Sequence, residues 1–456
     1  LMSPQTTLNV EIIDKTVPTD SYREHLGITW LLNHKKYVQD ATGKYDYEKD
    51  YYGFQPPSHH REGQVKALPE QYDAYDVIYL ADTYGVYEED LATEERAAQG
   101  ELSEKVYGGL EEQEWNAILK RLDQEKPSLL IAEYNTFASP TGKKVQDRVT
   151  DYLGIDWSGW VGRYFDELNP EKNDEIPNWI VKTAQNDWSY NGGGFILVND
   201  HTSEVIVLED EKHVKNGDIQ LVFTQEGQQK FGLKKSPSYN YWFDIVTPTN
   251  DGQTLAHYEW NLTTKGKQLL KDHEIPETFA AVVERRHPQS MSVYFAGDYN
   301  DLERTPNVYH VKGLTNVYRF LQKFSDESFY WSAYVPMTEK ILEEFAGMNN
   351  KEKQVSSKDE TLQTNARVTK EQFEILQDGE WTPMTIKGVN MGMGKPGAFP
   401  GEAAITEDEY YRWFQQIGEM NANTVRVYTL HPPGFYNALK RYNEHHEEKI
   451  YLFHGA

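Results

Sequence analysis

The sequence predicts an α/β protein in two parts, and three observations lead to this prediction. The first ~190 residues alternate buried strand patterns with helical ones, which is typical of a doubly wound sheet covered by helices on both faces. Residues 192–283 change to short strands separated by turn residues, which indicates a β-rich insertion. From residue 373 the pattern reads strand, helix, strand, helix, strand, with short connections.

The first region supplies the predicted strands and helices of the doubly wound part. His25–Val38 contains the apolar run Ile28–Leu32, which predicts a first strand. Asp76–Asp82 and Ser128–Tyr134 follow as further buried strands. Between them, Leu110–Leu122 places apolar residues on one helical face, and a proline ends that helix. These elements predict a parallel sheet with crossover helices.

The insertion is predicted from four short strands separated by Asn, Asp and Gly clusters: Phe195–Val198, Val205–Leu208, Ile219–Phe223 and Tyr241–Val246. Ala280–Glu284 and Met291–Ala296 then have the pattern of strands that return to the first sheet. We therefore expect an α/β domain over residues 1–348 with its insertion at 192–283. A polar linker is expected over 349–372 and a second domain over 373–456.

The last region begins with a predicted strand at Met384–Met391 and a loop from Gly392. Thr406 and Glu409 form a capping box, which places the start of a helix there. Further strands are predicted at Asn423–Tyr428 and Ile450–Phe453, with a helix between them at Phe435–Tyr442. This β-α-β-α-β order is the opening of a parallel barrel or an open sheet.

Composition restricts the classes of partner. Lys and Arg number 46 and Asp and Glu 72, so the formal net charge is −26, and nucleic acid is excluded as an expected partner because its phosphates would be repelled. The 31 Tyr and 11 Trp suit either sugar faces or a large aromatic core, and both readings stay open. No stretch is apolar enough for a membrane span. The chain starts with Leu1 and looks trimmed, so a lost export segment or membrane anchor outside it is left open.

Motifs for cofactors and metals give no positive signal. The chain has no Cys, which removes thiol nucleophiles and thiolate metal sites. Gly392–Gly397 fits GxGxxG, but its proline and the late helix start argue against a dinucleotide site. Asp40–Tyr51 lacks the Gly and Glu of a calcium loop, and the pairs His59–His60 and His445–His446 are interpreted as surface histidines. We expect no cofactor and no metal site.

The final block carries a resemblance to a known group. The segments Gly388–Met391, Arg426–Pro432, Phe435–Leu439 and Tyr451–Gly455 resemble the start of the clan A glycoside hydrolase TIM barrels, closest to the β-glucuronidase and β-galactosidase type and to fungal β-1,3-glucanosyltransferases. The resemblance places Arg426 beside the nucleophile and implies that Asn390, Tyr428 and His431 contact substrate.

The alternation of side chains along a strand agrees in part with these implied roles. It places Val425 and Val427 on one face of the strand and Arg426 and Tyr428 on the other. Pairing of Arg426 with a barrel Glu for stability alone remains the alternative.

The resemblance covers only the end of the chain, whereas a whole barrel needs ~250 residues. It implies an acid/base Glu after the fourth strand and a nucleophile Glu after the seventh, so no catalytic residue is expected within this chain. The implied chemistry is retaining hydrolysis or transglycosylation between two carboxylates beyond Ala456.

The first region resembles, more loosely, the class I glutamine amidotransferase-like fold, including trehalose-utilisation-type domains. The likeness rests on Asp76–Tyr84, on Gly108–Gly109 with the helix that follows, on Ser128–Glu133 and on Tyr294–Asp298. Ala132–Thr136 occupies the place where amidotransferases carry their Cys, so the amidase reaction is excluded. Glu133 is interpreted as a satisfied strand-end carboxylate, with a ligand contact as the alternative.

Together these observations predict part of a bacterial, exported or surface-anchored protein that acts on a polysaccharide or oligosaccharide. The alternative from another class is a noncatalytic carbohydrate-binding or scaffold protein of the cell envelope, and a third is an intracellular small-molecule enzyme. The sugar, the linkage and the oligomeric state are not predicted by any motif.

Overall fold

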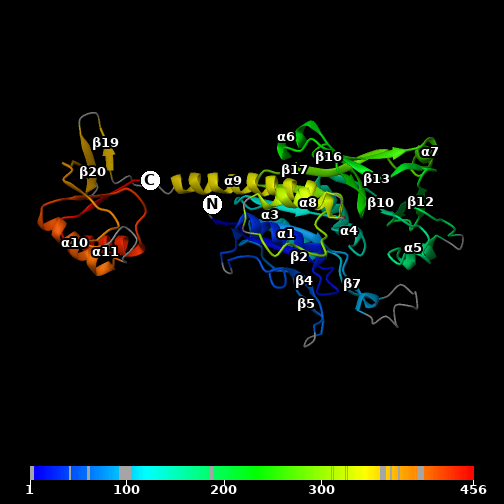
Figure 1. The fold of residues 1–456 in the computed structure, drawn as a ribbon, viewed down its shortest axis with the longest axis horizontal. Coiled ribbons are helices and arrows are strands. Elements are labelled where there is room, and N and C mark those ends of the chain that lie inside the picture. Colours follow the sequence, from blue (N-terminus) through cyan, green and yellow to red (C-terminus); the bar gives the residue numbers. More distant parts are fainter. Residues whose placement is uncertain are drawn as a thin grey trace. The chain divides into compact units, whose positions relative to one another are not determined.

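The computed structural model describes residues 5–40, 43–58, 62–91, 104–184, 188–309, 311, 313–323, 325, 327–359, 366–369, 372–377, 380–395, 397 and 405–455. The chain forms two compact units, Leu1–Lys353 and Gln354–Ala456. Each unit is described by itself (Figure 1). The predicted pair His59–His60 and most of the loop that follows Gly397 lie outside the described residues.

The N-terminal unit is built on one mixed sheet of fourteen strands. In chain order these are β2 (Val10–Asp14), β4 (Tyr52–Gln55), β5 (Gln64–Lys66), β6 (Val77–Asp82), β9 (Ser128–Ala132), β10 (Ile155–Phe165), β11 (Gly194–Asn199), β12 (Val205–Glu209), β13 (Val214–Phe223), β14 (Ser238–Tyr239), β15 (Phe243–Pro248), β16 (Gln253–Leu262), β17 (Thr278–Arg286) and β18 (Ser290–Phe295). Two short pairs stand apart, β1 (Thr6–Thr7) with β3 (Tyr37–Val38), and β7 (Val86–Tyr87) with β8 (Lys105–Tyr107).

The helices of this unit are α1 (Arg23–Lys35), α3 (Glu112–Leu122), α4 (Lys143–Leu153), α5 (Asn178–Thr183), α6 (Gln225–Phe231), α7 (Thr264–Asp272), α8 (Leu314–Leu321) and α9 (Val335–Asp359). A 3₁₀ turn, η1 (Glu88–Leu91), and a π-helical turn, η2 (Tyr330–Tyr334), complete the described elements. None of the helices in the described ranges combines the length and the apolar character that crossing a bilayer requires.

Parallel strands form the middle of the sheet, in the order β18-β9-β6-β2-β4. Every residue of β6 and β9 is buried, as expected for parallel strands covered on both faces. Helix α1 packs against β2 and β6, whereas α3 contacts β9 and α4 contacts β18. The carboxyl ends of these strands therefore lie along one edge of the sheet.

The strands predicted as an insertion continue this same sheet. The order β12-β11-β10-β15-β17 is antiparallel and joins the parallel part through the pairing of β17 with β18. The four predicted strands of this region correspond to β11, β12, β13 and β15, and the two returning strands correspond to β17 and β18. A second small core lies under β10–β12 and includes Phe165, Leu168 and Ile180.

The strand predicted at Ile28–Leu32 is wrong, because these residues belong to helix α1. All five of these residues are buried. The run therefore has no exposed polar side, and no helical periodicity in the sequence distinguishes it from a strand. The first strand of the large sheet is β2, which is buried along its whole length.

The C-terminal unit contains two small sheets and two helices. The antiparallel strands are β19 (Ala366–Val368), β20 (Phe373–Gln377) and β21 (Glu380–Pro383), the parallel strands are β22 (Gly388–Asn390), β23 (Thr424–Val427) and β24 (Tyr451–His454), and the helices are α10 (Glu407–Glu419) and α11 (Pro433–His445). The predicted strand Met384–Met391 is shorter than expected, since only its second half pairs with β23. The predicted capping box is confirmed: Thr406 Oγ1 accepts the Glu409 N–H at 3.3 Å, and the Glu409 carboxylate accepts the Thr406 N–H at 2.8 Å.

The parallel sheet β22-β23-β24 carries its core on one side. Val425 and Val427 are fully buried against α10 and α11, where they meet Tyr410, Phe414 and Phe435. In the described part of the chain, the first helix after Gly397 is α10, which begins at Glu407, so no described helix starts at the last glycine as a dinucleotide site requires. Helix α9 extends to Asp359, into the segment that the sequence suggests as a linker.

Candidate functional site

Carboxylates gather where the parallel strands of the N-terminal unit end. Asp14 and Asp82 are the last residues of β2 and β6 and lie side by side in register. Asp298 follows β18 in the loop that also holds Asp301, and Glu24 stands in the first turn of α1. In open α/β sheets, ligands bind at this edge. We therefore take these residues as the candidate functional site.

Asp82 is buried and held by a set of donors. Its Oδ1 atom accepts from Thr16 Oγ1 at 2.5 Å and from the Tyr84 N–H at 2.6 Å, while Oδ2 accepts from Asn135 Nδ2 at 3.2 Å. Burial raises the pKa of Asp82 to about 7, and the neighbouring Asp14 adds to this rise, although the Thr16 hydrogen bond opposes it. Asp82 can therefore exchange a proton near neutral pH.

Asp14 forms a buried pair with His25. The His25 Nδ1 atom lies 2.6 Å from Asp14 Oδ2, and the Nε2 atom lies 2.7 Å from the carbonyl oxygen of Tyr47. A carbonyl only accepts, so Nε2 carries a proton, and a second proton lies between Nδ1 and the carboxylate. This pair fixes the side chain of Asp14 at the end of β2.

Glu24, Asp298 and Asp301 bring one oxygen each within 4.8 Å of one another. Arg23 donates to both oxygens of Asp301, at 2.7 Å and 2.6 Å, and is the cation closest to the group in the described part of the chain. Burial, followed by the charges of Asp298 and Asp301, raises the pKa of Glu24 well above its ordinary value. Burial and the charge of Asp301 do the same to the pKa of Asp298. A metal cation is one group that these three residues could hold.

Glu133 anchors the loop that carries Asp298 and Asp301. Its carboxylate is 1% exposed and accepts the N–H groups of Tyr299 and Asn300, at 3.1 Å and 3.2 Å, and a short bond from the Tyr79 hydroxyl. Burial raises the pKa of Glu133 to about 8 despite these hydrogen bonds. The interpretation of Glu133 as a satisfied carboxylate is confirmed.

Tyr134 lies on the opposite side of the strand end from Glu133. Its ring stacks on Trp242 with centroids 6.2 Å apart and an interplanar angle of 14°. The residue is 7% exposed, and burial raises its pKa, followed by the charges of Asp244, Asp82 and Asp298. The phenol is therefore neutral and stands among three carboxylates as a hydrogen-bond donor.

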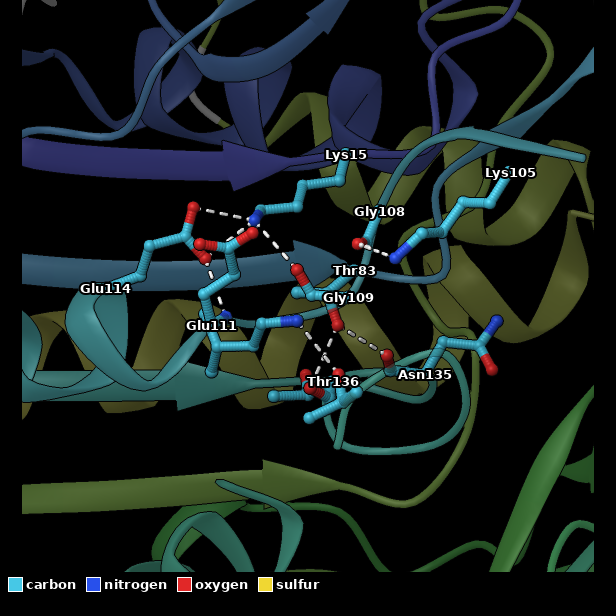
Figure 2. A network of polar contacts seen from close by, with 11 residues as sticks. Lys15, Thr83, Lys105, Gly108, Gly109, Glu111, Glu114, Asn135 and Thr136 are labelled. Carbon is cyan, nitrogen blue, oxygen red and sulfur yellow. Dashed lines mark hydrogen bonds and ion pairs between the residues drawn. The ribbon is translucent and has the colours of Figure 1, made fainter. Parts of the chain in front are cut away.

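A polar network fixes the loops at the ends of β2, β6 and β9 (Figure 2). Lys15 Nζ, 1% exposed, donates to the Gly109 carbonyl at 2.8 Å and to both Glu114 oxygens at 2.7 Å. Thr83 Oγ1 donates to the carbonyl groups of Asn135 and Thr136, each at 2.9 Å. All three Lys15 protons have acceptors, so this buried lysine positions loops and is not available as a nucleophile.

Asn135 lies within the segment Ala132–Thr136, which the amidotransferase resemblance places where those enzymes carry their Cys. Its φ is 63°, a left-handed conformation that is uncommon outside glycine and better tolerated by Asn than by most residues. A carboxamide in this position holds Asp82 and supplies no nucleophile.

The residues predicted from the barrel resemblance lie in the C-terminal unit. Asn390 pairs in register with Arg426 at the ends of β22 and β23. Arg426 and Tyr428 are exposed, and the Arg426 guanidinium lies 4.9 Å from the centre of the Tyr428 ring. Among the described residues, no carboxylate forms an ion pair with Arg426, so its predicted partner is not found there.

His431 is separated from that exposed group. It is 6% exposed, its Nδ1 atom lies 3.0 Å from the Thr429 carbonyl oxygen, and its ring packs 4.6 Å from the ring of Phe435. The structure therefore brings Asn390, Arg426 and Tyr428 to one strand-end face and places His431 in the core beneath it.

Sequence reasoning missed the carboxylate group of the N-terminal unit. Glu24 is remote in sequence from Asp298 and Asp301, so no spacing motif connects them. One signal was present: Asp82 and Asp298 each follow a buried apolar strand, and carboxyl ends of parallel strands share an edge.

Comparisons with known proteins give two likenesses of structure. No family model and no curated protein matches the chain. The chain is similar to Agd3, described as a novel carbohydrate deacetylase, with 10% identity and a TM-score of 0.30 over 93% of this chain and 43% of that one. It is also similar to the cytoplasmic protein STM3548 from Salmonella typhimurium, with 12% identity and a TM-score of 0.29 over 74% of this chain and 98% of that one.

The chain thus spans less than half the length of the deacetylase that it resembles. Both TM-scores lie below 0.5, and we base the proposals that follow on the residues of this chain alone. The fold itself is a mixed α/β arrangement with a large mixed sheet.

Proposed function

We propose that the chain is part of a carbohydrate-active protein, a retaining glycoside hydrolase or transglycosidase that acts on a polysaccharide. In this proposal the C-terminal unit is the first part of a (β/α)8 barrel, and the catalytic Glu pair is supplied by strands beyond Ala456. An extracellular or cell-surface location belongs to the same proposal.

The observation that supports the proposal is the uneven covering of the parallel sheet β22-β23-β24. Helices α10 and α11 bury Val425 and Val427 on one side. On the other side Arg426 and Tyr428 are exposed, and Phe453 of β24 is partly exposed. A parallel sheet is normally buried on both faces, so this uncovered side fits the inner face of a barrel whose remaining strands are still to come.

Arg426 places a positive charge on this uncovered face of the sheet. An arginine on the inner wall of a barrel needs a carboxylate partner, and among the described residues it has only the Tyr428 ring. A nucleophile Glu on a later strand would supply that partner, and the guanidinium would hold it ionised. Asn390, beside Arg426 in register, offers an amide to a sugar hydroxyl.

The test uses the full-length protein, assayed on aryl β-glycosides and on β-glucans. We expect Arg426→Ala to lower kcat/KM by about 100-fold or more, with the midpoint of thermal unfolding almost unchanged. Arg412→Ala is the matched control, since Arg412 is an exposed arginine of the same unit on the covered side, in α10. If the Arg426 variant loses stability and rate together, Arg426 is a structural residue and the proposed site is wrong.

A noncatalytic carbohydrate-binding or scaffold protein is the second candidate. It is favoured by the absence of Cys from the chain, because the amidase reaction of the resembling enzymes needs a thiolate. This candidate predicts binding of neutral oligosaccharides without turnover. Affinity electrophoresis of the full-length protein in β-glucan gels distinguishes it from the enzyme, which also releases reducing sugar.

A further inference from the structure

We propose that helix α8, together with the basic residues around it, binds the surface of a lipid bilayer that contains anionic phospholipids (Figure 1). The contact is peripheral: the outer face of this short helix lies in the headgroup region, and the helix does not span the bilayer. This surface belongs to the N-terminal unit, and its binding does not depend on the proposed barrel.

One face of α8 packs against the core of the N-terminal unit. Thr315 is buried, and Leu314 and Tyr318 pack against the main core. The Tyr318 ring stacks on Trp331, with centroids 4.8 Å apart and an interplanar angle of 23°. Leu314 and Tyr318 are four residues apart and therefore lie on the same side of the helix. This packing sets which residues of α8 point away from the core.

The face of α8 that points away from the core is apolar. It carries Val317, Phe320 and Leu321, which have the i, i+3 and i+4 spacing of neighbours on a helix surface. Their exposed fractions are 52%, 78% and 65%. A helix on the surface of a globular domain normally presents polar residues to solvent, and a helix that is apolar on both sides is normally buried on both. Neighbouring exposed apolar side chains of this kind indicate an interaction surface.

The segment that leads into α8 has the same apolar character. Val308 and Val311 are exposed. The Leu314 N–H donates to the Val311 carbonyl at 3.2 Å, so Val311 lies against the first turn of the helix. Trp30 of α1 donates its Nε1–H to the Pro306 carbonyl at 3.0 Å, which fixes this segment on the N-terminal unit. The exposed valines are therefore presented by a segment that is held in place.

The charge around this apolar face indicates the chemistry of the partner. Residues 304–323 contain four Lys and Arg residues and neither Asp nor Glu, within a chain whose formal net charge is −26. Arg304 and Lys323 are exposed, and Arg319 is partly exposed. Among the described residues, neither Arg304 nor Arg319 forms an ion pair with a carboxylate. The partner should therefore be apolar and also negatively charged.

A bilayer with anionic headgroups has both properties. Phe and Leu side chains enter the boundary between headgroups and acyl chains, whereas Lys and Arg keep their charged ends at the phosphates. Anionic lipids attract basic residues that lie close to the membrane surface. The acidic remainder of the chain opposes this contact only weakly, because salt screens charges beyond about 8 Å at physiological ionic strength.

Other occupants fit this surface less well. A symmetric dimer would bring the same face of two copies together, and the like charges of Arg304, Arg319 and Lys323 in the two copies would repel one another. A neutral polysaccharide could stack on Phe320, but it offers no counterpart to the aliphatic Leu321 or to the positive charges. The bilayer is therefore the occupant that the apolar face and the charge favour together.

The experiment measures binding of the full chain to large unilamellar vesicles by flotation, in NaCl at about 0.15 M. One set of vesicles is phosphatidylcholine alone, and the other contains phosphatidylglycerol as about a third of its lipid. We expect binding to the anionic vesicles. The partition coefficient should be at least about tenfold lower for the neutral vesicles, and for the anionic vesicles in about 1 M NaCl, because charge attraction is absent or screened there.

Two double variants separate the apolar and the charged contributions. Phe320→Ser with Leu321→Ser should lower the partition coefficient on anionic vesicles at least about tenfold, because it removes the side chains that enter the bilayer. Arg304→Gln with Lys323→Gln should lower it at least about fivefold. The midpoint of thermal unfolding should stay almost unchanged in both variants, since all four side chains are exposed.

Matched controls come from exposed residues elsewhere in the chain. Met420→Ser removes an apolar side chain of the C-terminal unit that is exposed to a similar degree. Lys120→Gln removes an exposed positive charge of α3. Both variants should bind anionic vesicles as the parent chain does.

The absence of Cys from the chain permits a direct readout of the contact. Leu321→Cys labelled with acrylodan should show blue-shifted emission on anionic vesicles, whereas labelled Met420→Cys should not. The proposal is overturned if the parent chain does not bind anionic vesicles in about 0.15 M NaCl. It is equally overturned if Phe320→Ser with Leu321→Ser leaves that binding unchanged.

Two other outcomes would assign the face to a different occupant and overturn the proposal. One is a dimer in sedimentation velocity that Phe320→Ser with Leu321→Ser dissociates, because a second copy then covers α8. The other is a blue shift of labelled Leu321→Cys on soluble β-glucan in the absence of vesicles, because a polysaccharide then occupies the face.

Discussion

The carboxylate of Glu133 accepts the backbone N–H of Tyr299 at a distance of 3.1 Å, across the ends of two neighbouring parallel strands. The same carboxylate takes the next N–H along the chain, that of Asn300, and the hydroxyl of Tyr79. One side chain thereby sets the path of the loop that carries Asp298 and Asp301. Glu133 therefore positions Asp298 and Asp301, and its own carboxylate oxygens are already occupied by hydrogen bonds.

The first prediction concerns this anchor. Glu133→Ala should lower the free energy of unfolding of the N-terminal unit by about 2–3 kcal/mol or more, because it leaves two buried N–H groups and the Tyr79 hydroxyl without their acceptor. Glu133→Gln should cost less, since its carbonyl oxygen can still accept both N–H groups. Urea denaturation measures both variants. Equal losses for Ala and Gln would show that the two N–H hydrogen bonds do not account for the loss.

The second prediction concerns pH. Burial raises the pKa of Asp82 and of Asp244 from 3.8 to about 7, and that of Glu133 from 4.5 to about 8. Between the unfolded and folded pKa values the folded state binds more protons than the unfolded state. Stability therefore falls as pH rises, by up to about 1.4 kcal/mol per pH unit for each group. Unfolding in urea should thus need less denaturant at pH 8 than at pH 6.5.

Three histidines make the stability of the folded chain rise with pH, but this effect belongs to a lower pH range than that of the buried carboxyl groups. Burial lowers the pKa of His34, His213 and His287 below the ordinary 6.5, so their contribution to stability rises with pH and is complete near pH 6.5. The decline above pH 6.5 should become shallower in Asp82→Asn and in Glu133→Gln. A flat profile in the parent chain between pH 6.5 and 8 would contradict the raised pKa values.

The third prediction separates the two faces of the C-terminal sheet. Arg426→Ala should change the free energy of unfolding by less than about 0.5 kcal/mol, because the side chain is exposed and its guanidinium has only the Tyr428 ring as a partner among the described residues. Val427→Ala should cost about 2 kcal/mol, since Val427 is fully buried between the sheet and the two helices. Thermal unfolding of both variants measures the two losses of stability. A large loss for Arg426→Ala would mean that its face is covered in solution.

The fourth prediction is that this chain alone turns over neither glycosides nor glutamine. The proposed barrel has its two carboxylates outside the chain, and the chain has no Cys to serve as an amidase nucleophile. Assays use aryl glycosides, β-glucans and glutamine, with heat-inactivated chain as the blank. Glycoside turnover above the blank would refute the assignment of the catalytic pair, and glutaminase turnover would refute the silent N-terminal unit.

Sequence patterns predicted the elements that have clear boundaries. The buried strands β6 and β9 are short apolar runs preceded by polar turns, and the start of α10 follows from the Thr406–Glu409 capping box. Helix α1 escaped prediction because its apolar run is buried on all sides, which erases the periodicity that distinguishes a helix from a strand. Local signals such as capping residues therefore predict where an element begins. They do not show whether a fully buried apolar run is a helix or a strand.

The site was harder to predict than the fold, for a geometric reason. Asn390 and Arg426 were named because both end strands of one β-α-β unit, where sequence spacing maps onto neighbouring strands. Glu24 and Asp298 are far apart in the sequence, and they meet because contacts such as that of Asn300 with the Glu24 carbonyl tie the loop to α1. No periodicity within either segment encodes that contact. His431 illustrates the reverse case, since proximity in sequence to Tyr428 did not keep it on the exposed face.

The pairing of β18 with β9 has a consequence for how the chain reaches its native state. β9 ends at Ala132, and its hydrogen-bonded neighbour on one side, β18, begins only at Ser290. During synthesis at about 5–20 residues per second, this edge of β9 waits roughly ten to thirty seconds for its partner strand. Closing so long a loop late makes folding slow. The antiparallel strands that fill the interval must already be ordered by then, because β17 delivers β18 to its place through a tight antiparallel connection. A nascent chain stopped before residue 290 would expose an apolar edge of β9 to other chains, and it should depend on chaperones to stay unaggregated.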